Sequence, residues 1–450
     1  MNQTDIKYNF KYLLFDRLLQ LINQIIIMSL IAKFIGPINF GSLSFSITIV
    51  NLFTLIANWG LDKTILLRLF NKNISTTNSL LGALTLKILL SLTIITTLYF
   101  YFYYSKSLFN LNITDSNLIL FLSPMIFFNL WTVFDAYFQY KLNSYITSLA
   151  RIVTFLFLIL LRIFCFFSNS SFLFISFLHV LEQFLILIIL FVLFLKKIKY
   201  SNKIEIDFVI IFQELKFYIL NGLSFVTISF LFIVQNKIIQ MYIFSNVKTE
   251  IVGTYSLITS IIEIILSIST FISILFLPRL LSKLKIHFIV FYRYFNNVLM
   301  PYLILIGIII TIVMIFFGFI IINYFKNYPY IFNFYYVLIL MIPLLFISFG
   351  INLFLIVMNK PKTILYLSII SIIIIYILSI LIIPIYFQNG ILITYVFAQF
   401  FACIIIPILF SKAAKSILYS SCKILLNKFF YMNTFKYFNE LLLKSKNKNI

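Results

Sequence analysis

Apolar runs of about 20 residues recur along the whole chain and are separated by short polar connections. Coiled as an α-helix, a run of this length crosses the roughly 30 Å of hydrocarbon in a bilayer. The runs do not alternate residue by residue, as the strands of a membrane β-barrel would. The pattern predicts an all-α polytopic membrane protein with about twelve transmembrane helices. The predicted spans are Tyr12–Phe34, Gly41–Leu66, Ser79–Tyr104, Asn117–Tyr140, Tyr145–Ser168, Phe172–Leu195, Lys216–Met241, Val252–Pro278, Phe295–Asn323, Phe332–Met358, Thr363–Pro384 and Asn389–Ser411.

Lysine and arginine concentrate in every second connection, as at Arg68 and Lys72 and in the stretch Lys196–Asp207. The positive-inside rule places these connections, and both termini, in the cytoplasm. The net charge of +22 therefore reflects topology, and we expect no nucleic-acid partner. Met1–Phe10 is polar and the apolar segment after it is too long for a cleavable signal, so the first span is expected in the mature protein.

The two halves of the chain resemble each other weakly. Gly41-Ser-Leu-Ser opens the second span and Arg68 follows it, while Gly253-Thr-Tyr-Ser opens the eighth span and Arg279 follows at nearly the same distance. Two halves of six spans share one orientation, which implies lobes related by a pseudo-two-fold axis along the membrane normal. We expect an N-lobe at 1–195, a cytoplasmic linker at 196–215, a C-lobe at 216–411 and a basic cytoplasmic or interfacial tail at 412–450.

Composition agrees with lipid as the main solvent. The chain is 63% hydrophobic and 10% charged, with a mean hydropathy of +1.10. The spacing of Cys165, Cys403 and Cys422 implies neither a disulfide framework nor a metal site. Phosphate-cradling glycine loops and Asp-x-Asp patterns are missing from the sequence, so we expect no cofactor and no enzyme activity of the ATPase or nucleotide-sugar type.

Polar residues follow helical spacing on four of the predicted spans. An ionisable group at mid-membrane costs roughly 2.5–3.5 kcal/mol, so these side chains should face protein or water. Such faces can line a hydrated cavity, or they can bond helices together for about 0.6 kcal/mol each. For a single Ser or Asn the bonding interpretation is favoured, whereas the four faces together favour a cavity. Their members are Asp16, Arg17, Gln20, Asn23 and Gln24 in span 1, Ser44, Thr48, Asn51, Asn58 and Asp62 in span 2, Asn221, Ser224, Asn236, Lys237 and Gln240 in span 7, and Ser256, Ser260, Glu263, Ser267 and Thr270 in span 8.

Basic residues gather near the cytoplasmic ends of the first three spans. Arg17, Lys63 and Lys87 are predicted to form a cationic vestibule that opens inward, with Asp16 and Asp62 holding the cations in place. A cationic cavity suits an anionic cargo, and for a phosphate group arginine supplies forked donors and lysine a point charge. Lys237 is a further candidate for contact with the cargo.

Two other charged groups favour structural roles. Asp135 and Arg151 lie equally far from the turn at Lys141–Ser144, so a helical hairpin would place them at one depth and a salt bridge is the simplest use. Arg162, His179 and Glu182 flank the turn after Ser168 in the same way. A proton relay is the alternative for this second group.

Gly36–Leu69 resembles the second-span region of the Wzx-type oligosaccharide flippases, a branch of the multidrug/oligosaccharidyl-lipid/polysaccharide (MOP) exporter superfamily. The pattern is Gly-Pro-x-x-Phe-Gly, then Ser-Phe, then Gly-Leu-Asp and a later Arg. Gln235–Phe244, Val252–Leu257 and Phe276–Ser282 are similar in the second half, although family members often carry Asp where this chain has Asn236. The resemblance implies a two-lobed, V-shaped bundle that rocks between inward-open and outward-open states.

The resemblance also implies a cargo, an undecaprenyl-pyrophosphate-linked oligosaccharide moved from the cytoplasmic to the periplasmic leaflet of the bacterial inner membrane for O-antigen or capsule assembly. A polysaccharide polymerase, a chain-length regulator and membrane lipids are the candidate partners, and Glu263 is the candidate for coupling to H⁺ or Na⁺. Two alternatives stay open. A multidrug cation exporter would carry acidic cavity residues, whereas a membrane polymerase or glycosyltransferase would carry a large outer loop.

Overall fold

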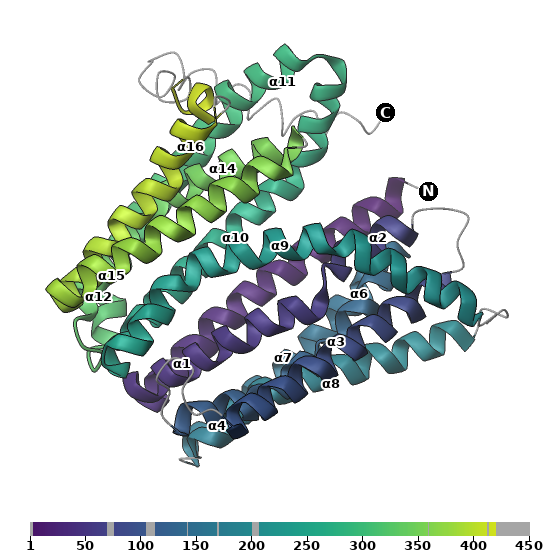
Figure 1. Ribbon diagram of the computed structural model, residues 1–450, viewed down its shortest axis with the longest axis horizontal. Helices are drawn as coiled ribbons and strands as arrows, with labels where there is room; N and C mark the ends of the chain where they lie inside the picture. Colours follow the sequence, from purple (N-terminus) through teal and green to yellow (C-terminus); the bar gives the residue numbers. More distant parts are fainter. Residues whose placement is uncertain are drawn as a thin grey trace. The chain divides into compact units, whose positions relative to one another are not determined.

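The computed structural model describes residues 3–69, 76–104, 113–141, 143–168, 171–199, 207–358, 360–411 and 414–419, without the side chains of 3–27, 103–104, 113–114, 198–199, 270–279, 281–286, 290 and 361. All regular secondary structure within these ranges is helical (Figure 1). The helices are α1 (Gln3–Asn58), α2 (Leu61–Leu69), α3 (Thr76–Tyr104), α4 (Ile113–Leu122), α5 (Pro124–Phe128), α6 (Trp131–Tyr140), α7 (Ser144–Phe167), α8 (Phe172–Lys199), α9 (Phe208–Asn246), α10 (Thr249–Ile286), α11 (Phe288–Tyr294), the π-helix η2 (Phe295–Leu299), α12 (Met300–Tyr324), α13 (Ile331–Leu340), α14 (Ile342–Val357), α15 (Pro361–Phe400), the π-helix η3 (Phe401–Ile405) and α16 (Ile406–Phe410).

Ten apolar helical segments in the described part of the chain are long enough to cross a membrane. The two segments Met28–Leu69 and Lys362–Phe410 are far longer than a crossing needs. Each contains a sharp turn, at Gly36 in α1 and at Phe387 in α15. Lys362–Phe410 therefore covers two of the predicted spans, and α1 together with α2 (Gln3–Leu69) covers the first two, so the fold agrees with about twelve crossings.

The turn in α1 is set by the sequence Gly36-Pro37. Gly36 has φ 74° and ψ 174°, a conformation that is open only to glycine without strain. A Cβ at this position would meet nothing within 4 Å, so the backbone angles and not crowding require glycine here. Proline at position 37 also disfavours a helical conformation at residue 36. The first two predicted spans therefore form one continuous element with a break where the sequence predicts it.

The described chain divides into two compact units, which are considered separately. The first comprises Met1–Ile261 with Tyr324–Ile331, and the second comprises Ile262–Asn323 with Phe332–Ile450. In the first unit α9 packs along α3 and α1, so this helix groups with the helices that precede it. This division differs from the lobe boundary expected between 195 and 216, and the six-plus-six arrangement stays a prediction.

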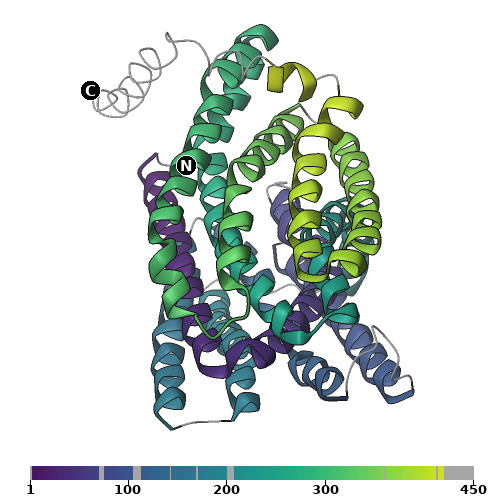
Figure 2. The ribbon, with the colours of Figure 1, turned by 90° about the vertical axis from the view of Figure 1, so that its left-hand side faces the viewer.

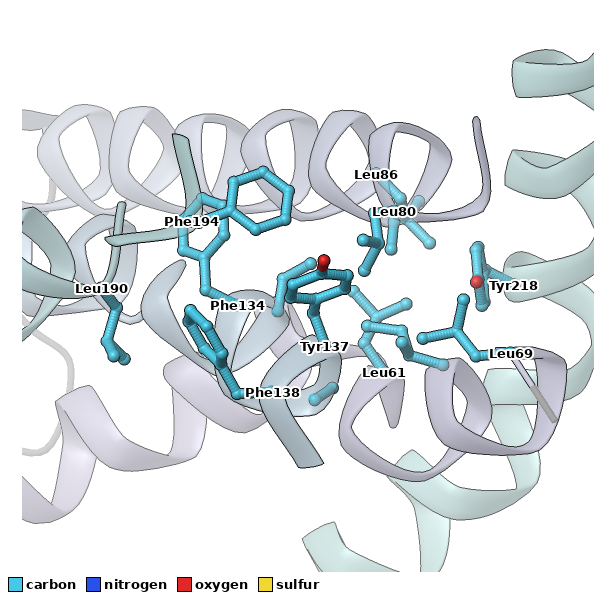
Figure 3. Close-up of a cluster of buried hydrophobic side chains, with 14 of the residues drawn as sticks. Leu61, Leu69, Leu80, Leu86, Phe134, Tyr137, Phe138, Leu190, Phe194 and Tyr218 are labelled. Atoms are coloured by element: carbon cyan, nitrogen blue, oxygen red, sulfur yellow. The ribbon is translucent and has the colours of Figure 1, made fainter. Parts of the chain in front are cut away.

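The core of the first unit lies between α2, α3, α6, α8 and α9 (Figure 3). Aromatic rings from α6 and α8 meet there, with 4.9 Å between the ring centroids of Phe134 and Phe194 and 5.0 Å between those of Tyr137 and Phe194. Leu61 and Leu69 bring both ends of α2 into the same cluster. One face of the short helix α2 is therefore buried from its first residue to its last.

The connection between α12 and α13 belongs to the first unit because it binds to α1 and α10. The Tyr328 hydroxyl donates to the Ala32 carbonyl at 2.6 Å, and Thr254 Oγ1 donates to the Pro329 carbonyl at 3.1 Å. Burial raises the pKa of Tyr328, which keeps the hydroxyl protonated as a donor.

In the second unit α14, α15 and α16 run close together, as both ribbon views show (Figure 2). Its core is aromatic, with the Phe354 ring 5.4 Å from Phe291 and 5.0 Å from Phe295. Gly350 lets α14 approach α12, since a Cβ there would lie 2.4 Å from Met300 Sδ. The outer face of α12 carries exposed rings such as Phe316 and Phe319, which suits a surface solvated by lipid.

Candidate functional site

A sharp turn at Trp59-Gly60 separates α1 from α2. Both residues have positive φ, 45° for Trp59 and 68° for Gly60. The turn is clamped against α9, because Trp59 Nε1 donates to the Ile219 carbonyl at 3.0 Å. A Cβ on Gly222 would lie 2.2 Å from the Trp59 carbonyl oxygen, so only glycine fits there. This contact fixes the direction in which the first turn of α2 leaves α1.

The ammonium group of Lys87 is fully buried beside this turn, at 0% exposure. Its Nζ donates to Asn58 Oδ1 at 2.7 Å, to Asn129 Oδ1 at 3.0 Å and to Thr132 Oγ1. An ammonium has three N–H donors, and all three are engaged. Lys87 thus joins α3 to the end of α1 and to the α5–α6 connection, and it has no donor left for a cargo in this structure.

Asn58 connects Lys87 to Asp62 through two hydrogen bonds. Its Nδ2 donates to Asp62 Oδ2 at 2.6 Å, while its Oδ1 accepts from Lys87. The two partners fix the orientation of the amide, since one is a donor and the other an acceptor. Asp62 and Lys63 are both exposed at the start of α2, and Lys63 Nζ lies 5.4 Å from the Phe225 ring centroid on α9. The buried ammonium of Lys87, acting through Asn58, thus positions the exposed carboxylate of Asp62 next to the exposed Lys63.

The other end of α2 is bound to α9 by an ion pair that the sequence did not predict. Arg68 Nη2 donates to Glu214 Oε1 at 2.6 Å and Arg68 Nε donates to Glu214 Oε2 at 2.8 Å. The Arg68 guanidinium also lies 4.2 Å from the Phe217 ring centroid. We expected Arg68 only to set topology. The one signal available was an acidic residue, Glu214, among the basic residues at the predicted cytoplasmic end of a span.

The polar face shared by spans 2, 7 and 8 forms bonds between helices at its central positions. Gln240 is buried and its Nε2 donates to Ser44 Oγ at 3.0 Å and to Ser256 Oγ at 2.9 Å. Thr48 Oγ1 donates to Gln240 Oε1 at 3.4 Å. For these four residues the structure supports the bonding interpretation and not a cavity lining.

Among the remaining predicted residues, Asn221 and Ser224 are exposed, Ser267 is half-buried, Ser260 is buried, and the side chain of Thr270 lies outside the described residues. Asn51, Asn236 and Glu263 are exposed and Lys237 is half-buried, with Glu263 in the second unit. The backbone of the five candidates in span 1 lies in α1, but their side chains are outside the described residues: Asp16, Arg17, Gln20, Asn23 and Gln24. The described residues therefore bring together Asn58, Asp62, Lys63 and Lys87, with Asn129 and Thr132 as partners that sequence reasoning missed.

Both structural ion pairs expected from the helical hairpins are confirmed. Arg151 Nη2 lies 2.8 Å from Asp135 Oδ2, and Arg162 Nη2 lies 3.0 Å from Glu182 Oε2. His179 Nε2 is buried and has no hydrogen-bond partner. Short turns at α6–α7 and α7–α8 hold each pair at a common depth, as the sequence predicted.

The family model of polysaccharide biosynthesis proteins matches residues 7–283. This chain belongs to that family. The match covers the Asn58–Lys87 cluster and α9, and it ends within α10. No curated protein matches the sequence.

Several solved structures have a similar fold. The lipid II flippase MurJ in an inward closed conformation is similar over 93% of this chain and 91% of its own, at 17% identity and a TM-score of 0.64. An inward-facing multidrug resistance MATE family transporter of the MOP superfamily covers 89% of this chain and 96% of its own, at 11% identity and a TM-score of 0.56. A MATE protein in complex with MaD3S follows at 14% identity and a TM-score of 0.52, covering 90% and 96%. The predicted MOP-type fold is confirmed.

Proposed function

We propose that the protein is a flippase that moves an undecaprenyl-pyrophosphate-linked oligosaccharide from the cytoplasmic to the periplasmic leaflet of a bacterial inner membrane. The match to polysaccharide biosynthesis proteins carries this proposal, and the MurJ-like fold supports it. A pyrophosphate and its sugars cannot cross the hydrocarbon unaided, because an unpaired buried charge is far too costly. In the proposed mechanism the protein alternates between inward-open and outward-open states, and polar and cationic side chains line the path of the head group.

Lys63 is our candidate for first contact with the pyrophosphate, together with Arg17. Lys63 is exposed and lies in the first turn of α2, next to the exposed Asp62. Lys87 serves as a positioning residue, because its three donors hold Asn58, Asn129 and Thr132. A membrane potential that is negative inside favours outward movement of the anion by about 2.3 kcal/mol per charge at 100 mV. Glu263 stays the candidate for coupling to H⁺ or Na⁺.

The decisive experiment compares two lysines in reconstituted vesicles that contain a fluorescent lipid-linked oligosaccharide. Lys63 and Lys141 are both exposed, and their Nζ atoms lie 5.4 Å and 5.3 Å from an aromatic ring centroid. Lys63→Ala should slow translocation by about 10- to 150-fold, because a charge-assisted contact contributes about 1.5–3 kcal/mol. Lys141→Ala should leave the rate unchanged. Equal translocation rates for the two variants would show that Lys63 does not contact the cargo.

Multidrug export is the second candidate, and the MATE-like fold favours it. The exposed carboxylate of Asp62 would then hold an organic cation. Efflux of a cationic dye from the same vesicles tests this function. Dye efflux without oligosaccharide translocation would replace the flippase proposal.

A further inference from the structure

Asn221 lies between two aromatic rings on the side of α9 that contacts α2. Phe217, Asn221 and Phe225 are spaced four residues apart, so they share one face of the helix. A cation from α2 lies over each ring. The Arg68 guanidinium is 4.2 Å from the Phe217 ring centroid, and Lys63 Nζ is 5.4 Å from that of Phe225. The helix α2 therefore runs along this face of α9, with Asn221 between the two cations (Figure 1).

The Asn221 side chain is exposed within a predicted membrane span. It lies five residues after Lys216, where the span begins, which is about 7.5 Å along the helix axis. Leu220 and Leu223 are 68% and 51% exposed and suit contact with lipid, at about 140° and about 160° around α9 from Phe225. Asn221 is only about 40° from Phe225, on the side of α2. A polar side chain there faces water or cargo and not hydrocarbon.

The Asn221 amide has hydrogen-bonding groups to spare. Its Nδ2 donates to the Phe217 carbonyl at 2.8 Å, which leaves one N–H donor and the Oδ1 acceptor. Among the described residues the amide makes no other hydrogen bond. A neutral group that both donates and accepts matches the hydroxyls of a sugar, whereas the ammonium of Lys63 matches a phosphate. The half-buried ring of Phe225 beside it offers an apolar surface to the C–H face of a pyranose.

We propose that Asn221 and Phe225 contact the sugar attached directly to the pyrophosphate, while Lys63 contacts the pyrophosphate itself. This inference rests on the flippase function proposed above and adds a specificity contact to it. Side chains four residues apart on a helix lie about 5–6 Å from each other, which matches the width of one pyranose ring. The contact distinguishes the loaded carrier lipid from the free carrier, undecaprenyl pyrophosphate, which has the same charge but no hydroxylated ring.

The test measures the affinity of the full chain in lipid nanodiscs for two probes by tryptophan fluorescence. One probe is undecaprenyl pyrophosphate, and the other is the same lipid carrying N-acetylglucosamine. The wild-type protein should bind the sugar-bearing probe about fivefold more tightly, the effect of about one net hydrogen bond. Asn221→Ala should abolish this preference by weakening only the sugar-bearing probe. Phe225→Leu removes the ring but keeps an apolar side chain, and should lower the preference as well.

Asn246→Ala is the matched control. Asn246 is also exposed on α9, and its Nδ2 donates to the carbonyl of Tyr242, four residues earlier, at 3.0 Å. Loss of this local bond should change neither affinity. If Asn221→Ala acts only by loosening its own helix turn, the two asparagine variants will behave alike and the sugar contact is refuted.

Two further results would overturn the contact. These are equal affinity of the wild-type protein for both probes, and an Asn221→Ala variant that weakens both probes by the same factor. Lys63→Ala separates this test from that of the function, because it should weaken both probes and leave their ratio unchanged. Unchanged affinities in Lys63→Ala would refute the pyrophosphate contact while the ratio still reports on Asn221. Binding of neither probe would refute the flippase function and the sugar contact with it.

Discussion

The ion pair between Arg68 and Glu214 offers the clearest test of how α2 is held against α9. Both oxygens of the Glu214 carboxylate accept from the guanidinium, at 2.6 Å and 2.8 Å. The Glu214 side chain is 3% exposed, whereas that of Arg68 is 23% exposed. Removing the arginine would therefore leave a buried carboxylate without its cation. The perturbation is Arg68→Ala, with Glu214→Ala and the double variant completing a thermodynamic cycle.

The expected magnitude follows from this asymmetry in burial. Breaking a fully buried pair from one side costs about 3–5 kcal/mol, because the remaining charge is stranded. Water reaches about a quarter of the Arg68 side chain, which lowers the expectation to about 2–3 kcal/mol. Arg68→Lys should cost about 1–2 kcal/mol, since lysine keeps the charge but cannot form the fork or stack as well on Phe217.

The measurement is the unfolding of the purified protein in a denaturing detergent, monitored by tryptophan fluorescence. The chain has two tryptophans, and Trp59 in the α1–α2 turn contacts the same helix, α9. Lys216→Ala is the control, because Lys216 is exposed on α9 two residues from Glu214 and its loss should change stability by less than about 0.5 kcal/mol. If Arg68→Ala costs no more than Lys216→Ala, the pair does not hold α2 against α9.

Three further predictions concern the same unit. Lys87→Met should destabilise the protein by about 2–4 kcal/mol in the same unfolding assay, because it leaves buried acceptors without a donor. Gly222→Ala should cost about 1–3 kcal/mol and shift Trp59 emission, since its Cβ would collide with the Trp59 carbonyl, whereas Ser224→Ala on an exposed position of α9 should do neither. Tyr218→Phe should cost about 0.5–1.5 kcal/mol in the same assay, because it removes the 2.6 Å hydrogen bond to the buried Ser79 hydroxyl, and unchanged stability would show that this bond does not join α3 to α9.

The fold was predictable because the sequence patterns that indicate it extend over many residues. Runs of apolar residues fix the number and order of the spans, and the Gly36-Pro37 pair marks the break in α1. The pair of Asp135 and Arg151 was predictable for a different reason. A short turn sets two neighbouring helices at a known depth, so equal spacing from the turn implies contact.

The candidate site was only partly predictable. Lys87 was expected to face a vestibule, yet its ammonium is fully buried among Asn58, Asn129 and Thr132. Helical spacing shows which residues share a face, but it does not show which neighbour that face meets. The partnership of Arg68 with Glu214 was missed for the same reason, because it joins elements 146 residues apart in the chain.

The contacts of α9 bear directly on how the protein could move. Near the α1–α2 turn, α9 is bound through the Trp59 indole, and one end of α2 is bound to it through Arg68. These two contacts flank the exposed pair of Asp62 and Lys63 along α2. Any motion that lifts α9 from α2 must break a buried ion pair and an indole hydrogen bond together, so the cheaper motion carries α9 and α2 as one body. A hinge that opens a path to Lys63 is therefore expected on the C-terminal side of these contacts and not at the basic stretch before α9.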